Sequence, residues 1–83
     1  METAGIYLEI ISPDVPRPGM TAEKVVLPGT GGRFTILKGH APLISALTEG
    51  DIEYTVGGKT ERLHIRSGFV EVSDNRVSVC AEI

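Results

Sequence analysis

The segment DIEYTVGGKTERLHI, residues 51–65, carries the clearest fold signal in the chain. Apolar and polar residues alternate with a period of two on both sides of a glycine pair, which is the pattern of strands with one buried and one solvated face. Gly57 and Gly58 tolerate the positive φ values that a two-residue hairpin turn demands. The segment therefore predicts a β-hairpin. Its inward residues are expected to be Ile52, Tyr54, Val56, Leu63 and Ile65.

The same alternation recurs on both sides of this hairpin. It predicts further short strands over residues 7–11, 23–27, 33–37, 43–47, 68–72 and 77–81. Glycine-rich or polar turns separate them, and three prolines make residues 13–19 a stiff surface loop rather than a central strand. No window has the apolar spacing of a helix. The sequence therefore predicts an all-β fold, a two-sheet sandwich or barrel, without a substantial helix.

Length and composition narrow the function classes. The chain has 83 residues, which is one small domain, residues 1–83, and excludes a two-domain enzyme with an interdomain cleft. Its 8 basic and 11 acidic side chains give a net charge of −3. Because the basic residues are scattered, the sequence lacks the one-sided positive patch of a nucleic-acid-binding domain. We therefore expect no nucleic-acid partner.

The cysteine count and the hydropathy pattern indicate the cellular compartment in which the protein is expected to work. The single cysteine, Cys80, cannot form an internal disulfide, so a reducing, cytosolic setting is expected. Cys80 follows Val79 on a predicted strand with no basic neighbour, which favours a buried, inert thiol. No apolar run approaches the roughly 18 residues that span a bilayer, and residues 1–5 lack signal-peptide features. Any membrane association is expected to depend on a partner.

Candidate catalytic and metal-binding residues give weak signals. The glycines of residues 28–32 precede a strand rather than a helix, so a hairpin turn is favoured over a phosphate loop. His40 and His64 lie 24 positions apart without a cluster of further ligands, which argues against zinc. Neither Ser45 nor Ser67 lies in a nucleophile elbow. We therefore expect no catalytic residue, metal or cofactor.

Lys59 supports an alternative function. A lysine beside the Gly57-Gly58 turn resembles the attachment lysine of biotinyl and lipoyl carrier domains, which are all-β and of similar length. Those domains flank the lysine with Met or Asp, and Gly-Gly-Lys-Thr does not match, so an exposed lysine at the start of a strand is favoured. A small β-barrel enzyme or binding module with an unrecognised pocket is the third possibility.

Two motif-bearing segments resemble the epsilon subunit of F-type ATP synthases. The first comprises Leu27-Pro28-Gly29, Gly32-Arg33-Phe34, Leu37 and Gly39-His40-Ala41-Pro42-Leu43. The second is Ser67-Gly68-Phe69-Val70-Glu71-Val72, followed by Asn75, Val77 and Val79. The opening run of residues 8–13 also fits, so the resemblance covers essentially the whole chain. It implies the N-terminal β-sandwich domain of that subunit, with about ten short strands.

The resemblance also implies a function and partners. The epsilon subunit belongs to the central rotor stalk, where it docks on the gamma subunit and on the polar loops of the membrane c-ring. There it couples ion translocation to ATP synthesis without being the catalyst. The expected location is peripheral, at the cytoplasmic face of the bacterial inner membrane, with membrane association only through the complex. Relatives continue into a C-terminal helical hairpin that can inhibit hydrolysis; none follows Ile83 here, so no such inhibition is expected.

By position within the motif, the resemblance assigns two interfaces. The predicted c-ring interface comprises Gly29, Thr30, Gly31, Gly32 and Arg33. The predicted gamma interface comprises His40, Ala41, Pro42, Leu43 and Ile44. Many relatives carry an acidic residue at the position of Arg33, so we expect Arg33 to pair with an acidic or backbone-carbonyl partner on the c-ring loop.

Overall fold

The computed structural model describes residues 5–13 and 18–83, and within these residues it contains nine strands and no helix. The predicted loop of residues 13–19 lies partly outside the described residues, at positions 14–17. The strands are β1 (Ile6–Ile11), β2 (Met20–Ala22), β3 (Lys24–Gly29), β4 (Gly32–Ile36), β5 (Leu43–Leu47), β6 (Gly50–Val56), β7 (Lys59–Ile65), β8 (Ser67–Ser73) and β9 (Arg76–Glu82). The predicted all-β class is confirmed.

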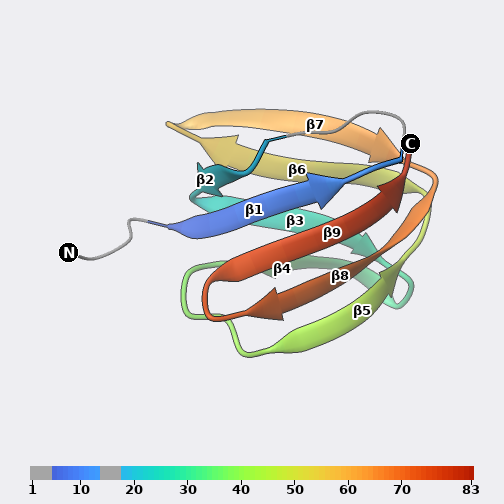
Figure 1. Cartoon of the computed structure of the whole chain (residues 1–83), viewed down its shortest axis with the longest axis horizontal. Helices are drawn as coiled ribbons and strands as arrows, with labels where there is room; N and C mark the ends of the chain where they lie inside the picture. Colours follow the sequence, from blue (N-terminus) through green and yellow to red (C-terminus); the bar gives the residue numbers. More distant parts are fainter. Residues whose placement is uncertain (1–4, 14–17) are drawn as a thin grey trace.

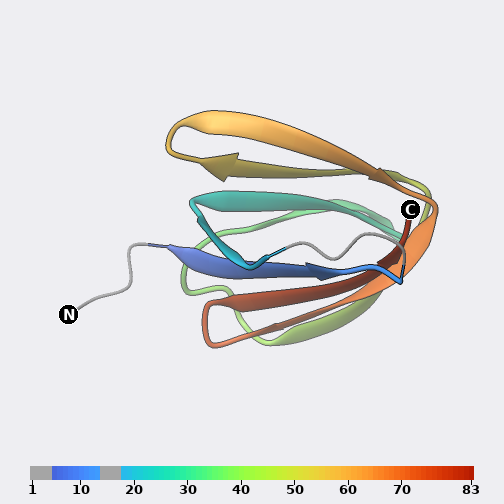
Figure 2. The same cartoon turned by 45° about the horizontal axis from the view of Figure 1, so that its top comes forward.

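The strands form one curled sheet that folds over its own core. Hydrogen-bonded neighbours follow the order β2-β1-β9-β8-β5-β3-β6-β7, and β4 pairs with the other edge of β3. The curl places β3 and β4 behind β9 and β8, and β6 and β7 continue that rear layer (Figure 1). Figure 2 shows the same two layers from a tilted direction. The predicted sandwich is therefore present, with its two layers joined in a single sheet.

The two layers meet at the end of β3. Gly29 pairs with Gly32 of β4 on one side and with Leu47 of β5 on the other. A Cβ atom at Gly29 would lie 2.8 Å from both the Gly32 carbonyl oxygen and the Phe34 ring, so only glycine fits this corner. The Thr48 N–H donates to the Pro28 carbonyl at 2.9 Å and reinforces the junction.

Alternation along the strands builds the core as predicted. Side chains of successive residues point to opposite faces of the sheet, so alternate residues of each strand face the core. The expectation that Val56 is an inward residue is wrong, because Val56 ends its strand at the turn and is 37% exposed. The buried hydrophobic side chains are Ile6, Leu8, Ile10, Ala22, Val25, Leu27, Ile36, Leu47, Ile52, Tyr54, Leu63, Ile65, Val70, Val72, Val77, Val79 and Ala81.

The hairpin turn between β6 and β7 has the predicted geometry. Gly57 and Gly58 adopt φ values of 59° and 79° between paired Val56 and Lys59, which confirms the turn that the sequence predicts. The Gly58 N–H donates to the Glu23 carboxylate at 2.8 Å and anchors this turn to the start of β3.

Three features differ from the expectation. The short strand β2 was not predicted, and it pairs with the first half of β1. β1 pairs in parallel with β9, the chain's last strand, so the first and last strands lie side by side. The expectation that Cys80 is buried is wrong. Val79 and Ala81 face the core, so the alternation of β9 turns the Cys80 side chain outward, where it is exposed.

Candidate interaction surfaces

The predicted c-ring interface is the tight turn between β3 and β4. Thr30 and Gly31 form a two-residue turn closed by the Gly29 and Gly32 pair. Thr30, Gly31 and Gly32 are exposed, whereas Gly29 is buried in the corner between the layers. Because this tip carries only one small side chain, another chain's loop can approach its backbone closely.

Arg33 is bound within the domain rather than projecting freely from the turn. Its Nη1 donates to the Asp51 carbonyl oxygen at 3.0 Å, and its Nη2 donates to Glu53 Oε2 at 3.1 Å. Arg62 Nε lies 3.8 Å from the same Glu53 oxygen. A guanidinium group has five N–H donors, so these two bonds leave donors for a partner outside the domain. The intramolecular pairing was not predicted from the sequence.

The predicted gamma interface lies at the opposite end of the sandwich. The loop before β5 and the turn between β3 and β4 project from opposite ends of the strands, so the structure does not bring the two predicted interfaces together (Figure 1). His40, Ala41 and Pro42 are exposed, and His40 Nδ1 lies 2.7 Å from the Ala41 carbonyl oxygen. Leu43 packs against the core, while Ile44 is 75% exposed.

Ile44 belongs to a larger apolar surface on the outer face of β1, β9, β8 and β5. In the strand register, Ile11 lies beside Cys80, Cys80 beside Phe69, and Phe69 beside Ala46. All of them are exposed, and Phe69 is 65% and Ile11 52% exposed. We call this set, Ile11, Ile44, Ala46, Phe69 and Cys80, the apolar stripe. Single exposed apolar residues are ordinary, but a row across four strands indicates an interaction site.

Two shallow hollows adjoin the apolar stripe. One, of about 420 Å³, lies where Ile11 and Pro13 pass Phe69 and Cys80. The other, of about 280 Å³, lies between Ile44 and Phe69, with Glu71 and Ser78 on its polar side. Side chains of a partner can insert into these hollows, as they do in the well-packed centres of protein interfaces.

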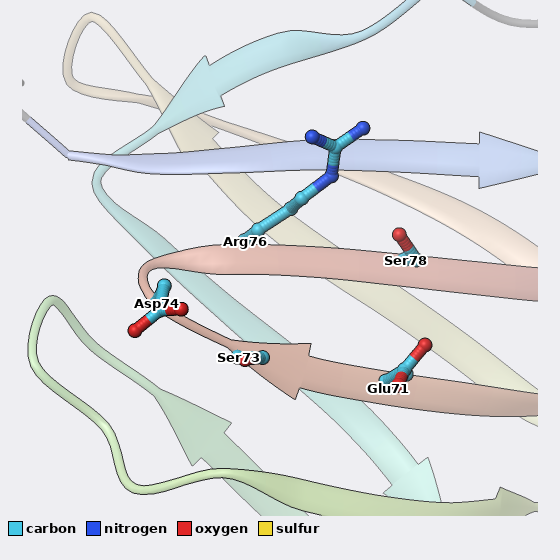
Figure 3. Close-up of a pocket in the computed structure, with 5 residues that line it drawn as sticks. All are labelled: Glu71, Ser73, Asp74, Arg76 and Ser78. Carbon is cyan, nitrogen blue, oxygen red and sulfur yellow. The ribbon is translucent and has the colours of Figure 1, made fainter.

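Polar residues border the stripe toward the turn between β8 and β9. A third hollow, of about 430 Å³, is lined by Glu71, Ser73, Asp74, Arg76 and Ser78 (Figure 3). Arg76 extends toward β1, where its Nη2 lies 3.4 Å from Glu9 Oε1 and its guanidinium carbon lies 5.2 Å from the centre of the Tyr7 ring. An apolar centre with a polar border is the usual composition of a protein interface.

The outer face of β6 and β7 carries a different cluster. His64 Nδ1 lies 2.9 Å from Asp51 Oδ1, and His64 Nε2 lies 3.2 Å from Glu49 Oε2. The hydrogen bond to Asp51, followed by that to Glu49, raises the pKa of His64 above its ordinary value of 6.5. The charged form of the imidazole is therefore favoured by folding.

This cluster predicts a pH-dependent contribution to stability. Because the pKa of His64 is higher in the folded state, the contribution is complete below the unfolded-state pKa near 6.5 and is lost as pH rises through the folded-state pKa. We expect His64→Gln to lower the urea unfolding midpoint more at pH 6 than at pH 8.5. An equal loss at both pH values would contradict this, and Asp51→Asn should lower the pKa of His64 in an NMR titration.

The other candidate sites, for metal binding, nucleophilic catalysis and lysine modification, have little support in the structure. Residues 5–13 and 18–83 contain no group of three or more His, Cys, Asp or Glu side chains that could hold a metal ion. Ser45 Oγ donates to the Ala46 carbonyl at 3.1 Å. Lys59 is exposed at the start of β7, as expected of an ordinary surface lysine. Within residues 5–13 and 18–83 the structure has no helix long and apolar enough to cross a membrane.

The family resemblance assigns only Ile44 of the apolar stripe to an interface, although Phe69 also lies in a motif segment, residues 67–72. Phe69 could have been found from the alternation of β8, because Val70 and Val72 face the core and therefore place this aromatic side chain outside. The position of Ile11 beside Cys80 depends on the parallel pairing of β1 with β9, for which the sequence has no local signal.

Comparisons with known proteins agree with this architecture. The model of the family described as ATP synthase, Delta/Epsilon chain, beta-sandwich domain matches residues 5–83. The chain is 49% identical over 80 residues to the ATP synthase epsilon chain of Desulfitobacterium hafniense, covering 95% of this chain and 61% of that protein. It is 44% identical over 77 residues to the ATP synthase epsilon chain of Nitratidesulfovibrio vulgaris, covering 93% of this chain and 58% of that protein. The chain thus spans about three fifths of these relatives' length.

Two solved structures share the fold. A chain in the cryo-EM structure of Euglena gracilis mitochondrial ATP synthase, OSCP/F1/c-ring in rotational state 1, superposes with a TM-score of 0.88 at 24% identity, over 95% of this chain and 51% of that chain. A chain in the central stalk/c-ring structure of Tetrahymena thermophila mitochondrial ATP synthase gives 0.80 at 12% identity, over 94% and 63%. At these identities the likeness concerns the fold.

Proposed function

Because the chain belongs to the family of ATP synthase delta/epsilon chain β-sandwich domains, we propose that it acts as a central-stalk subunit of an F-type ATP synthase. In this role it docks on the gamma subunit and on the polar loops of the c-ring, and it couples ion translocation to ATP synthesis. It is a non-catalytic part of a rotary complex. Beyond family membership, the observation that carries the proposal is the apolar stripe, a row of exposed apolar residues on the outer face of a small domain that buries a hydrophobic core.

The gamma subunit is the proposed occupant of the apolar stripe. Ile44, which the family resemblance assigns to the gamma interface, lies on the outer face of β5 beside Glu71 of β8, two residues along the strand from Ala46. The stripe thus continues the predicted interface across three further strands. Its aromatic centre at Phe69, the adjoining hollows and the polar border near Arg76 provide the anchor and rim that a stable protein contact needs.

The c-ring is the proposed partner of the turn between β3 and β4. The turn at Thr30 and Gly31 presents backbone with little side chain, which suits contact with another polar loop. The Thr30 N–H donates to the carbonyl oxygen of Ala46 in the apolar stripe at 3.3 Å, so the two proposed interfaces adjoin at this end of the sandwich, and one small domain can contact two parts of a rotor. The proposed location is the cytoplasmic face of the bacterial inner membrane, reached through the complex.

Arg33 provides a test of the c-ring contact. We expect Arg33→Ala to weaken binding of the stalk to the c-ring and to reduce the salt sensitivity of that binding. The loss of stability should be small, because a surface ion pair such as that with Glu53 contributes about 0.2–1 kcal/mol. Arg62→Ala, which removes the other arginine near Glu53, is the matched control. Unchanged assembly and salt sensitivity in Arg33→Ala would refute the contact.

Co-purification tests the proposed function as a whole. The tagged chain expressed in its own cell should bring down the gamma subunit and the c-ring, and failure to do so would overturn the proposal. The intact mass of the natural protein distinguishes a stalk subunit from a carrier domain, because covalent biotin or lipoate on Lys59 would add a defined mass. We expect the unmodified mass.

A further inference from the structure

We propose that Asn75 is a positioning residue, whose side-chain amide holds the Gly39–Pro42 loop in the conformation that docks on the gamma subunit. This inference rests on the function proposed above. It goes beyond that function because Asn75 lies outside both predicted interfaces and is not part of the apolar stripe.

Asn75 joins three segments that are distant in sequence. It is the second residue of the two-residue turn between β8 and β9, which is closed by paired Ser73 and Arg76. Its main-chain carbonyl oxygen accepts the Tyr7 N–H at 2.9 Å, at the start of β1. Its side-chain Oδ1 accepts the Gly39 N–H at 2.6 Å. One residue therefore ties the loop before β5 to both β1 and β9.

The turn itself does not require an asparagine side chain. Asp74 and Asn75 both have positive φ values, 49° and 60°, as in a type I′ hairpin turn. Glycine is the residue most favoured at the second position of such a turn, since it adopts this conformation without strain. The side chain at position 75 is thus available for another role, and the hydrogen bond from Gly39 is the role that the geometry assigns.

The bond to Gly39 acts at the entrance of the predicted gamma interface. Beyond Gly39 the chain passes through exposed His40, Ala41 and Pro42 into β5, where Leu43 is packed and Ile44 is exposed. Fixing Gly39 fixes how this loop leaves the domain relative to Ile44. A loop that is ordered before docking loses less conformational entropy on binding, so the bond should favour association.

Two substitutions separate the hydrogen bond from the turn. Asn75→Gly keeps the turn conformation and removes the acceptor, whereas Asn75→Asp keeps an acceptor oxygen and tolerates the same φ. In the Gly variant we expect amide hydrogen exchange at Gly39 to accelerate about three- to tenfold, with an unchanged or higher thermal midpoint. Its dissociation constant for the purified gamma subunit should rise by a similar factor, and the Asp variant should bind within about twofold of the wild type.

The two readouts distinguish the possible failures. If Gly39 exchange stays slow in Asn75→Gly, the hydrogen bond does not hold the loop and the proposal is overturned. If exchange accelerates but gamma binding is unchanged, or if Asn75→Asp binds as weakly as Asn75→Gly, the role in docking is overturned. If the wild-type chain does not bind gamma at all, the proposed function fails, and the exchange data still decide whether Asn75 orders the loop.

Discussion

Phe69→Asp should abolish stable binding to the gamma subunit, with a rise in the dissociation constant of at least about a hundredfold. Phe69 is 65% exposed in the isolated domain and lies between Cys80 and Ala46 in the apolar stripe. Burying a Phe side chain is worth about 1.5–3 kcal/mol, and a carboxylate forced into the same dry contact would cost several kcal/mol more. Isothermal titration calorimetry with purified gamma measures the change.

The control for this substitution is the same change at an exposed apolar residue elsewhere. Val56→Asp lies at the hairpin end of β6, outside the stripe, where Val56 is 37% exposed. It should leave gamma binding within about twofold of the wild type. Circular dichroism should show both variants folded. Equal affinity of Phe69→Asp and the wild type would exclude the stripe from the interface.

Leu8→Ala should give the largest loss of stability. Leu8 is completely buried and pairs with Val77 across the parallel contact of β1 and β9. Truncation of a buried leucine costs about 2–5 kcal/mol, because packing is lost and a cavity remains. In a domain of this size that loss corresponds to a fall in the thermal midpoint of roughly 10–30 °C. Calorimetry or thermal circular dichroism measures it.

Leu37→Ala is the matched control for the core. It removes the same atoms from a side chain that is 53% exposed, so the expected change is within about 0.5 kcal/mol. A similar loss in both variants would show that Leu8 does not occupy the dry core between the layers.

The architecture was largely predictable because its strands are marked by alternation and its turns by glycine. The hairpin at Gly57-Gly58 and the inward residues Leu8, Ile52 and Val77 follow from local rules alone. The strand β2 was missed because three residues are too short for a periodic pattern. Parallel pairing of β1 with β9 joins segments separated by almost the whole chain, and local rules contain no information about it.

The candidate surfaces were predictable only in part, for the same reason. A motif singles out a continuous loop, so the sequence indicated residues 29–33 and 40–44. The apolar stripe is assembled from four strands, and it becomes visible only when register places Ile11, Cys80 and Phe69 in one row. The pairing of Arg33 with Glu53 across β3 likewise depends on which strands are neighbours.

Thiol labelling of Cys80 tests the central claim most directly, because Cys80 is the chain's single cysteine and lies exposed within the apolar stripe. The measurement is the rate at which a maleimide adds to this chain, followed by intact mass, with and without saturating gamma subunit. Docking on the stripe predicts labelling at least about tenfold slower in the complex, since the centre of an interface excludes solvent. Labelling at the free rate in a complex that remains assembled would contradict the account.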